Sequence, residues 1–200
     1  MAAQNIKDIK KDIYLMMHKV GEMLELVEDA FAKNRTAQLD QANELFADIN
    51  KKEDELTAAL AKLAQSSIEA RTLLSVPAFV EKTATAVERI VDGIRVKIKE
   101  GLLFSDKAIQ ETSRLISTSK EMLKKAGESV ISGTAEAANA VSEESNMVIK
   151  MANDFATAHE DRLVTGECSP KSSSTYLCIL YAFEDLASYT KDAVRKSVQK

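Results

Sequence analysis

The sequence predicts an all-α protein built from a few long helices. Two prolines and six glycines in 200 residues leave little turn punctuation, so the elements between turns must be few and long. Ala, Glu, Lys and Leu, which favour helices, dominate the chain. Large apolar residues recur at helical spacing, and no strand-like alternation interrupts the pattern. We therefore expect six amphipathic helices packed as a bundle.

The first two predicted helices cover the N-terminal third of the chain. An apolar stripe predicts a helix over about residues 4–33, which Asn34 ends. Thr36 can cap the second helix, whose stripe runs to Leu63. Glu53 interrupts this stripe at a core-facing position, where a carboxylate is costly unless it is paired or bound. A polar rim, reached by the apolar stem of the side chain, is the other interpretation.

The remaining helices follow breaks in the pattern. Residues 66–78 read as a linker, in which Ser75 and Pro77 lead into a third helix. Ser105 is the expected cap of the fourth helix, and residues 165–170 form the clearest turn. Gly133 either marks a break or lies within a long helix. The four expected helices cover, in order, about residues 79–98, 102–125, 131–165 and 172–198.

Composition and charge narrow the function classes. A net charge of −4 and a pI near 5.4 provide no basic excess for phosphate backbones, which argues against nucleic acid as the main partner. No run of eighteen apolar residues exists, so we expect no membrane span. The first thirty residues carry charges among the apolar positions, unlike a signal or transit peptide. Cys168 and Cys178 are too few for a disulfide framework, and we expect reduced thiols in a cytoplasmic protein.

The chain also has a long-range period. Pro77 and Pro170, each near a helix start, are 93 residues apart, and Glu88 and Glu184 are 96 apart. This interval predicts the internal duplication of a three-helix unit within a single domain over residues 1–200. The expected repeats cover about residues 1–100 and 101–200.

A pair of carboxylates on the third predicted helix is a candidate functional site. Glu88 and Asp92 are four residues apart, so they project from neighbouring turns of one side and repel each other unless a positive group lies beside them. Arg89 is one candidate for that group. A metal ion is the other, because hard cations bind carboxylate oxygens. A solvated helix face is the alternative interpretation.

Three segments resemble the PhoU family of phosphate-uptake regulators. Residues 87–92, Val-Glu-Arg-Ile-Val-Asp, are similar to the Leu-Glu-Arg-Ile-Gly-Asp signature of the family's third helix. Residues 159–163 and 166–170, with Tyr176, resemble the turn between the fifth and sixth helices in PhoU-like domains of sodium/phosphate cotransporters. Residues 49–53 resemble the family's second helix. The resemblance implies a six-helix fold of two pseudo-symmetric three-helix bundles.

The resemblance also implies metal-binding residues, since some family members bind iron, zinc or other metals through paired carboxylates. Glu88 and Asp92 match the motif of the first repeat completely. In the second repeat Glu184 matches, but Asp185 replaces the Arg and Ser188 replaces the closing Asp, so we expect that site to be altered or empty. The expected metal ion is iron or a divalent ion at Glu88 and Asp92. Further candidate ligands are Glu184, Glu53 and Asp48, the last paired with Glu44 on the second helix; a solvated face is the alternative for that pair.

The function that the resemblance implies is regulatory and non-enzymatic. We expect a regulatory or accessory protein of phosphate transport that contacts a membrane phosphate transporter or its sensor kinase from the cytoplasm, at or near the inner face of the cell membrane. A homodimer is left open. A metal-free helical interaction scaffold unrelated to phosphate is the alternative. A di-metal hydrolase needs more histidines than His18 and His159 provide, and we interpret His159 as a polar residue at a helix end.

Overall fold

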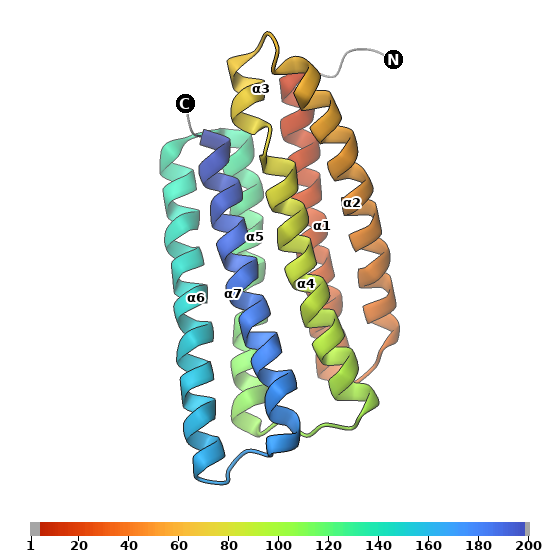
Figure 1. Cartoon of the computed structure of the whole chain (residues 1–200), viewed down its shortest axis with the longest axis vertical. Helices are drawn as coiled ribbons and strands as arrows, with labels where there is room; N and C mark the ends of the chain where they lie inside the picture. The colour runs from red at the N-terminus through yellow and green to blue at the C-terminus, as the bar shows by residue number, and fades with distance from the viewer. Residues whose placement is uncertain (1–4, 199–200) are drawn as a thin grey trace.

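The computed structural model describes residues 5–198, and these residues form seven α-helices and no strand. Six helices are long and run up and down the molecule, whereas α3 is a single short element (Figure 1). The all-α prediction is confirmed. The helices are α1 (Ile6–Lys33), α2 (Ala37–Leu63), α3 (Ile68–Leu73), α4 (Val76–Lys99), α5 (Asp106–Ser132), α6 (Ala135–Val164) and α7 (Pro170–Val198).

The long helices form two groups of three. In the first group α1 packs against α2 and α4, and in the second α7 packs against α6 and α5 (Figure 1). The groups meet along two seams, α4 against α7 on the side nearer the viewer and α1 against α5 behind it. This arrangement agrees with a three-helix unit used twice, although the duplication itself stays a prediction.

Several helix ends lie where local chemistry predicts them. Asn34 follows α1 in the left-handed conformation, with a φ of 56°. Ser105 precedes α5, and its Oγ accepts the backbone N–H of Ala108. Thr36 occupies the N-cap position of α2 but makes no capping hydrogen bond through its side chain. The predictions for Asn34 and Ser105 are therefore confirmed. Thr36 lies at the predicted N-cap position, but its side chain does not cap the helix.

The predicted linker over residues 66–78 contains the additional helix α3. Ser67 Oγ accepts the backbone N–H of Ala70, and Ala70 and Leu73 are fully buried. Two buried residues anchor this turn of helix to the bundle. It has six residues, which is too short for an apolar period to appear in the sequence.

The predicted end of the fourth long helix near residue 125 is wrong. The helix α5 continues to Ser132 and ends at Gly133, which has a φ of 62°. Gly127 is a contact residue, because a Cβ built there would lie 3.0 Å from Cδ2 of Tyr14 on α1. Ile131 therefore belongs to α5, where it is exposed, and does not point inward from the following helix.

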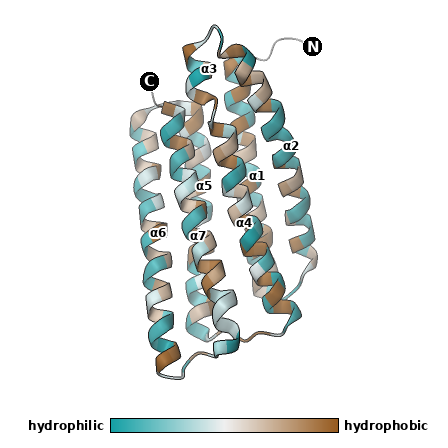
Figure 2. Ribbon diagram, viewed as in Figure 1, coloured by the Kyte–Doolittle hydropathy of each residue, from teal (hydrophilic) through white to brown (hydrophobic). Residues whose placement is uncertain are grey.

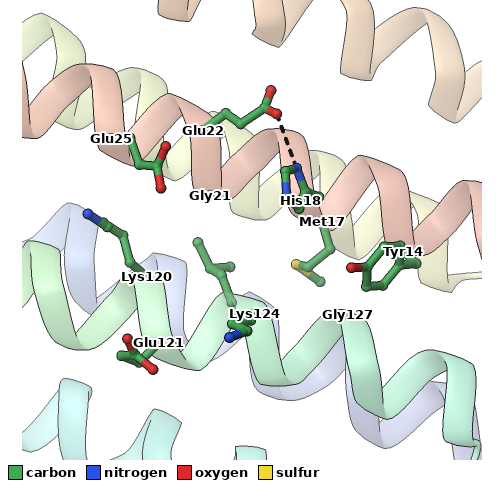
Figure 3. A pocket seen from close by; sticks show the side chains of 11 residues that line it. Tyr14, Met17, His18, Gly21, Glu22, Glu25, Lys120, Glu121, Lys124 and Gly127 are labelled. Atoms are coloured by element: carbon green, nitrogen blue, oxygen red, sulfur yellow. Dashed lines mark ion pairs between the residues drawn. The ribbon is translucent and has the colours of Figure 1, made fainter.

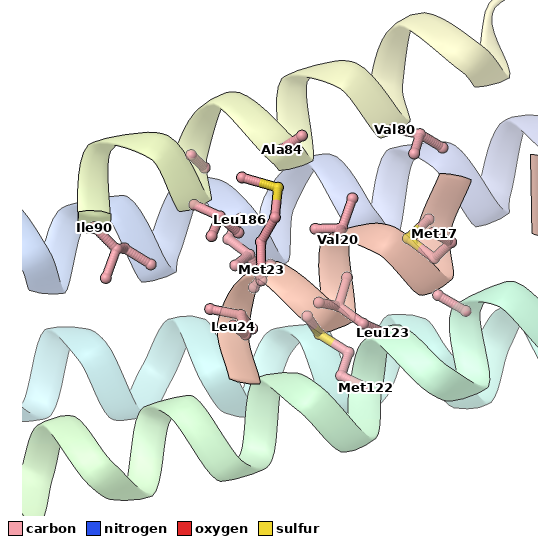
Figure 4. Close-up of a cluster of buried hydrophobic side chains, with 14 of the residues drawn as sticks. Met17, Val20, Met23, Leu24, Val80, Ala84, Ile90, Met122, Leu123 and Leu186 are labelled. Atoms are coloured by element: carbon pink, nitrogen blue, oxygen red, sulfur yellow. The ribbon is translucent and has the colours of Figure 1, made fainter. Parts of the chain in front are cut away.

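One hydrophobic core connects the two groups. Each long helix carries both hydrophilic and hydrophobic residues, as amphipathic packing requires (Figure 2). Buried side chains from α1, α4, α5 and α7 meet at the centre (Figure 4). Met17, Met23 and Met122 lie in this cluster, whereas Met147 is exposed. The described chain thus has one continuous core.

Candidate functional site

The α4 carboxylates lie on the side of the helix that faces α2. Arg95 follows Glu88 by two helical turns, and its guanidinium donates to Asp40 of α2 at 2.7 Å. Glu81, Glu88 and Asp92 share this side of α4, since they are spaced by seven and four residues. Glu88 is half-buried and Asp92 is exposed. The carboxylates therefore border the seam between α4 and α2.

These carboxylates are electrostatically uncompensated. Burial raises the pKa of Glu88, and the negative charges of Asp92 and Glu81 raise it further. Within residues 5–198, no basic side chain forms an ion pair with Glu88 or Asp92. The repulsion expected from their spacing is thus present in the folded chain.

Arg89 does not supply the missing positive charge. Its guanidinium bonds to the carboxylate of Asp185 on α7, across the seam between the two groups. Arg89 therefore lies on a different side of α4 from Glu88. The prediction that Arg89 neutralises the carboxylate pair is therefore wrong. The alternative, a bound cation, stays a prediction.

The structure separates the candidate ligands of α2. Asp48 accepts a hydrogen bond from Lys19 of α1 at 2.7 Å, and this contact lowers the pKa of Asp48. Asp48 thus lies on the α1 side of α2, away from Glu88, and Glu44 is exposed one turn earlier. Glu53 is half-buried and accepts the hydroxyl of Thr57 at 2.7 Å.

Amide side chains of α2 offer additional oxygen ligands toward α4. Asn43 and Asn50 are seven residues apart, and Asn43 follows the Arg95 partner Asp40 by one turn. The Oδ1 atoms of both asparagines are buried without a hydrogen-bond partner. Two carboxylates from α4 and amide oxygens from α2 are ligands of the type that a hard cation prefers. Among residues 5–198, however, no three His, Cys, Asp or Glu residues cluster as metal ligands do.

The corresponding side of α7 has a different chemistry. Lys191 follows Glu184 by two turns and donates to Oδ1 of Asn146 on α6 at 3.0 Å. Ser188, one turn before Lys191, shares this side of the helix. This side of α7 therefore carries one carboxylate, one hydroxyl and an ammonium group. The expectation that a second metal site is altered or empty stays a prediction.

A buried ionic network joins α5, α6 and α7, and sequence reasoning missed it. Glu111 is 3% exposed and receives two hydrogen bonds from Arg162, at 3.0 and 2.7 Å. The hydroxyl of Tyr176 donates to the same carboxylate at 2.5 Å, and burial together with this bond raises the pKa of Tyr176. One feature of the sequence could have indicated this site: Glu111 lies one turn after the buried Ala108 and so interrupts an apolar stripe, as Glu53 does on α2.

His159 extends this network. It is 2% exposed, its ring centroid lies 4.9 Å from that of Tyr176, and its Nε2 lies 2.9 Å from Oγ of Ser173. Burial and the nearby Arg162 lower the pKa of His159. The expected position near a helix end is right, but the side chain is inside the molecule. Because Nδ1 has no partner, the His159–Ser173 contact lacks the acid that orients a hydrolase histidine.

A surface groove follows the second seam, between α1 and α5 (Figure 3). Its volume is about 180 Å³, and Gly21 leaves it open because no side chain reaches that position. His18 pairs with Glu22 at 3.1 Å (Figure 3). Lys120 of α5 forms an ion pair with Glu28 of α1. Both glutamates (Glu22, Glu25, Glu121) and lysines (Lys120, Lys124) line this groove, so no single charge dominates it (Figure 3).

The architecture defines a class of protein: an all-α molecule of two three-helix groups joined along two seams. Its fold is that of PhoU. The phosphate transport system regulatory protein PhoU from Streptococcus pneumoniae matches with a TM-score of 0.83 and 14% identity, over 96% of this chain and 92% of that one. PhoU from Pseudomonas aeruginosa gives 0.74 and 16%, over 96% and 95% of the two chains. A PhoU-like protein from Shewanella oneidensis gives 0.60 and 16%, over 95% and 97%.

Other comparisons add no closer relative. No protein-family model and no curated protein matches the chain. The similarity to solved structures therefore establishes the fold, and the fold predicted from residues 87–92 and 159–170 is confirmed. Across residues 5–198, none of the helices combines the length and apolar character that a membrane crossing needs.

Proposed function

We propose that this protein is a PhoU family member that regulates phosphate transport through protein contacts and without catalysing a reaction. One observation carries the proposal: 96% of this chain matches the fold of a phosphate transport system regulatory protein. The Glu-Arg-Ile sequence at residues 88–90 supports it, because this part of the family signature lies on the helix that joins the two groups. The proposed partners are a membrane phosphate transporter or its sensor kinase, contacted from the cytoplasm.

The test is a phosphate-uptake measurement in the organism that encodes the chain. Deletion of the gene should change the uptake of radiolabelled phosphate when cells move from low to high phosphate, and a plasmid copy should restore regulation. Affinity purification of a tagged copy after crosslinking should recover a transporter or kinase component. Unchanged uptake together with recovery of unrelated partners would favour the alternative, a helical scaffold with no phosphate role.

A bound cation is the second part of the proposal. Glu88 and Asp92 would bind one hard divalent ion, with the amide oxygen of Asn50 as a further ligand and water completing the shell. The raised pKa of Glu88 and the unpartnered Oδ1 of Asn50 support this assignment. The ion would neutralise the stacked carboxylates and fasten α4 to α2, which is a structural or sensing role.

Elemental analysis after incubation with Mn²⁺, Mg²⁺, Zn²⁺ or Fe²⁺ tests the cation proposal. The variant Glu88→Gln/Asp92→Asn should lose the bound ion that wild type retains. The matched control is Glu44→Gln/Asp48→Asn, which removes a pair with the same spacing from the other side of α2. Equal loss in both variants, or no retained metal in wild type, would reject a specific site at α4.

A further inference from the structure

A small hollow lies at the end of the bundle where α5 and α7 begin and α6 ends, the lower end in Figure 1. Its volume is about 230 Å³. Three serines, a cysteine and a buried histidine contribute to its lining, and Glu167 is the acidic residue there. The polar lining residues are Ser105, Ser169, Ser172, Cys168, His159, Glu167 and Tyr176.

Two long helices open onto this hollow with their N-termini. The helix α5 has 27 residues and α7 has 29, so each carries a partial positive charge at its first turn. Ser105 Oγ accepts the backbone N–H of Ala108, and Ser169 Oγ accepts that of Lys171. Because these oxygens act as acceptors, the hydroxyl hydrogen of each serine can be donated to a ligand.

The histidine provides an independent sign of a ligand. His159 is 2% exposed and lines the hollow, yet its Nδ1 is buried without a hydrogen-bond partner. A buried polar atom without a partner is costly, and a bound polar molecule would remove that cost. When Nε2 accepts the hydroxyl of Ser173, Nδ1 carries the proton and acts as a donor.

The neighbouring acid does not repel an anion strongly. Glu111 is not among the residues that line the hollow; it accepts the hydroxyl of Tyr176, and both of its oxygens accept hydrogen bonds from Arg162. Its charge is therefore compensated within the network. Glu167 is exposed at the rim, where one of its oxygens accepts the hydroxyl of Thr165. It is the residue that should weaken anion binding.

We propose that this hollow binds a small tetrahedral oxyanion, with inorganic phosphate as the probe. The donors are the hydroxyls of Ser105 and Ser169, Nδ1 of His159 and the first turns of α5 and α7. The inference does not depend on the regulatory role proposed above, because it follows from the hollow itself. If the protein does not bind phosphate, this inference fails, whereas the regulatory proposal is still decided by partner recovery and by the control of phosphate uptake.

Aspartate substitutions at helix caps give a sharp test. Ser105→Asp and Ser169→Asp keep a capping oxygen but add a negative charge to the hollow. The matched control is Thr134→Asp, which makes the same change at the cap of α6, at the opposite end of the bundle. Glu167→Gln removes the acid at the rim.

Binding is measured by calorimetry and by NMR shifts of the His159 ring, with sodium phosphate added at constant ionic strength. Wild type and Thr134→Asp should bind phosphate equally, each with a dissociation constant of about 1 mM or lower. Ser105→Asp and Ser169→Asp should bind roughly tenfold more weakly or worse. Glu167→Gln should bind more tightly than wild type.

Three results would overturn the proposal: no binding to wild type, equal weakening by Thr134→Asp, or full binding by both serine variants. Circular dichroism melting identifies any variant that fails to fold. If either cap variant unfolds, Glu167→Gln decides the question, because its side chain is exposed. Binding that does not strengthen in that variant contradicts an anion site in this hollow.

Discussion

Replacing Arg162 with methionine should remove much of the stability of this protein. The guanidinium makes two hydrogen bonds to Glu111, and the two side chains are 11% and 3% exposed. The substitution Arg162→Met keeps an unbranched apolar side chain. It leaves the buried carboxylate of Glu111 without its ion-pair partner, and the Tyr176 hydroxyl remains as a hydrogen-bond donor to that carboxylate. Breaking a buried ion pair in this way costs about 3–5 kcal/mol, against a total stability of about 5–15 kcal/mol for a typical domain.

Urea unfolding at pH 7, followed by circular dichroism, measures this loss. The double variant Glu111→Leu/Arg162→Met removes both charges and should recover part of the stability, because no uncompensated ion is then buried. A loss below about 1 kcal/mol in Arg162→Met would refute the reasoning. So would a double variant whose loss equals the sum of the two single losses, since the network would then carry no coupling.

Three further substitutions test α4 and its neighbours. In metal-free protein, Glu88→Gln should raise the melting temperature at pH 7, because the folded state raises the pKa of Glu88 and therefore loses stability as pH rises through that value. Below the ordinary pKa of 4.5 the two proteins should melt alike, and a benefit that persists at pH 3 would contradict this assignment. Gly21→Ala should stabilise the protein in urea unfolding by about 1 kcal/mol, since the position is open. Gly93→Ala should gain less or lose stability, because its new Cβ would lie 2.6 Å from Cγ1 of Ile179 on α7; equal gains from both alanines would show that the α4–α7 seam adapts freely.

Apolar spacing predicted the long helices well because each buries one continuous stripe. The same reasoning could not distinguish a glycine that ends a helix from one that packs against a neighbour. The helix was therefore predicted to end near residue 125, whereas α5 packs against α1 at Gly127 and ends at Gly133. The helix α3 was missed because its six residues bury two positions only and complete no recognisable period.

For the candidate sites, too, the sequence predicted what depends on one helix but not what depends on the packing of several helices. Spacing placed Glu88 and Asp92 on one side of a helix, since that depends on helical geometry alone. Spacing could not show that Arg89 reaches α7, because partner choice depends on how helices are arranged in space. Glu111 and Arg162 are 51 residues apart and come together only in the folded bundle. Long-range polar pairs therefore lay outside what the sequence pattern could predict.

The Arg89–Asp185 bond makes the two halves of the chain different at the seam where they meet, because one half contributes a positive charge and the other a negative charge. These positions are 96 residues apart, the same interval that separates Glu88 from Glu184. Two copies of the first half placed face to face would set arginine against arginine, and two copies of the second would set aspartate against aspartate. The ion pair thus favours a seam between one first half and one second half over a seam between two like halves. Because the two halves differ at this contact, they can also differ elsewhere: the first half has the carboxylate pair Glu88 and Asp92, and the second has Glu184 and Ser188 at the corresponding positions.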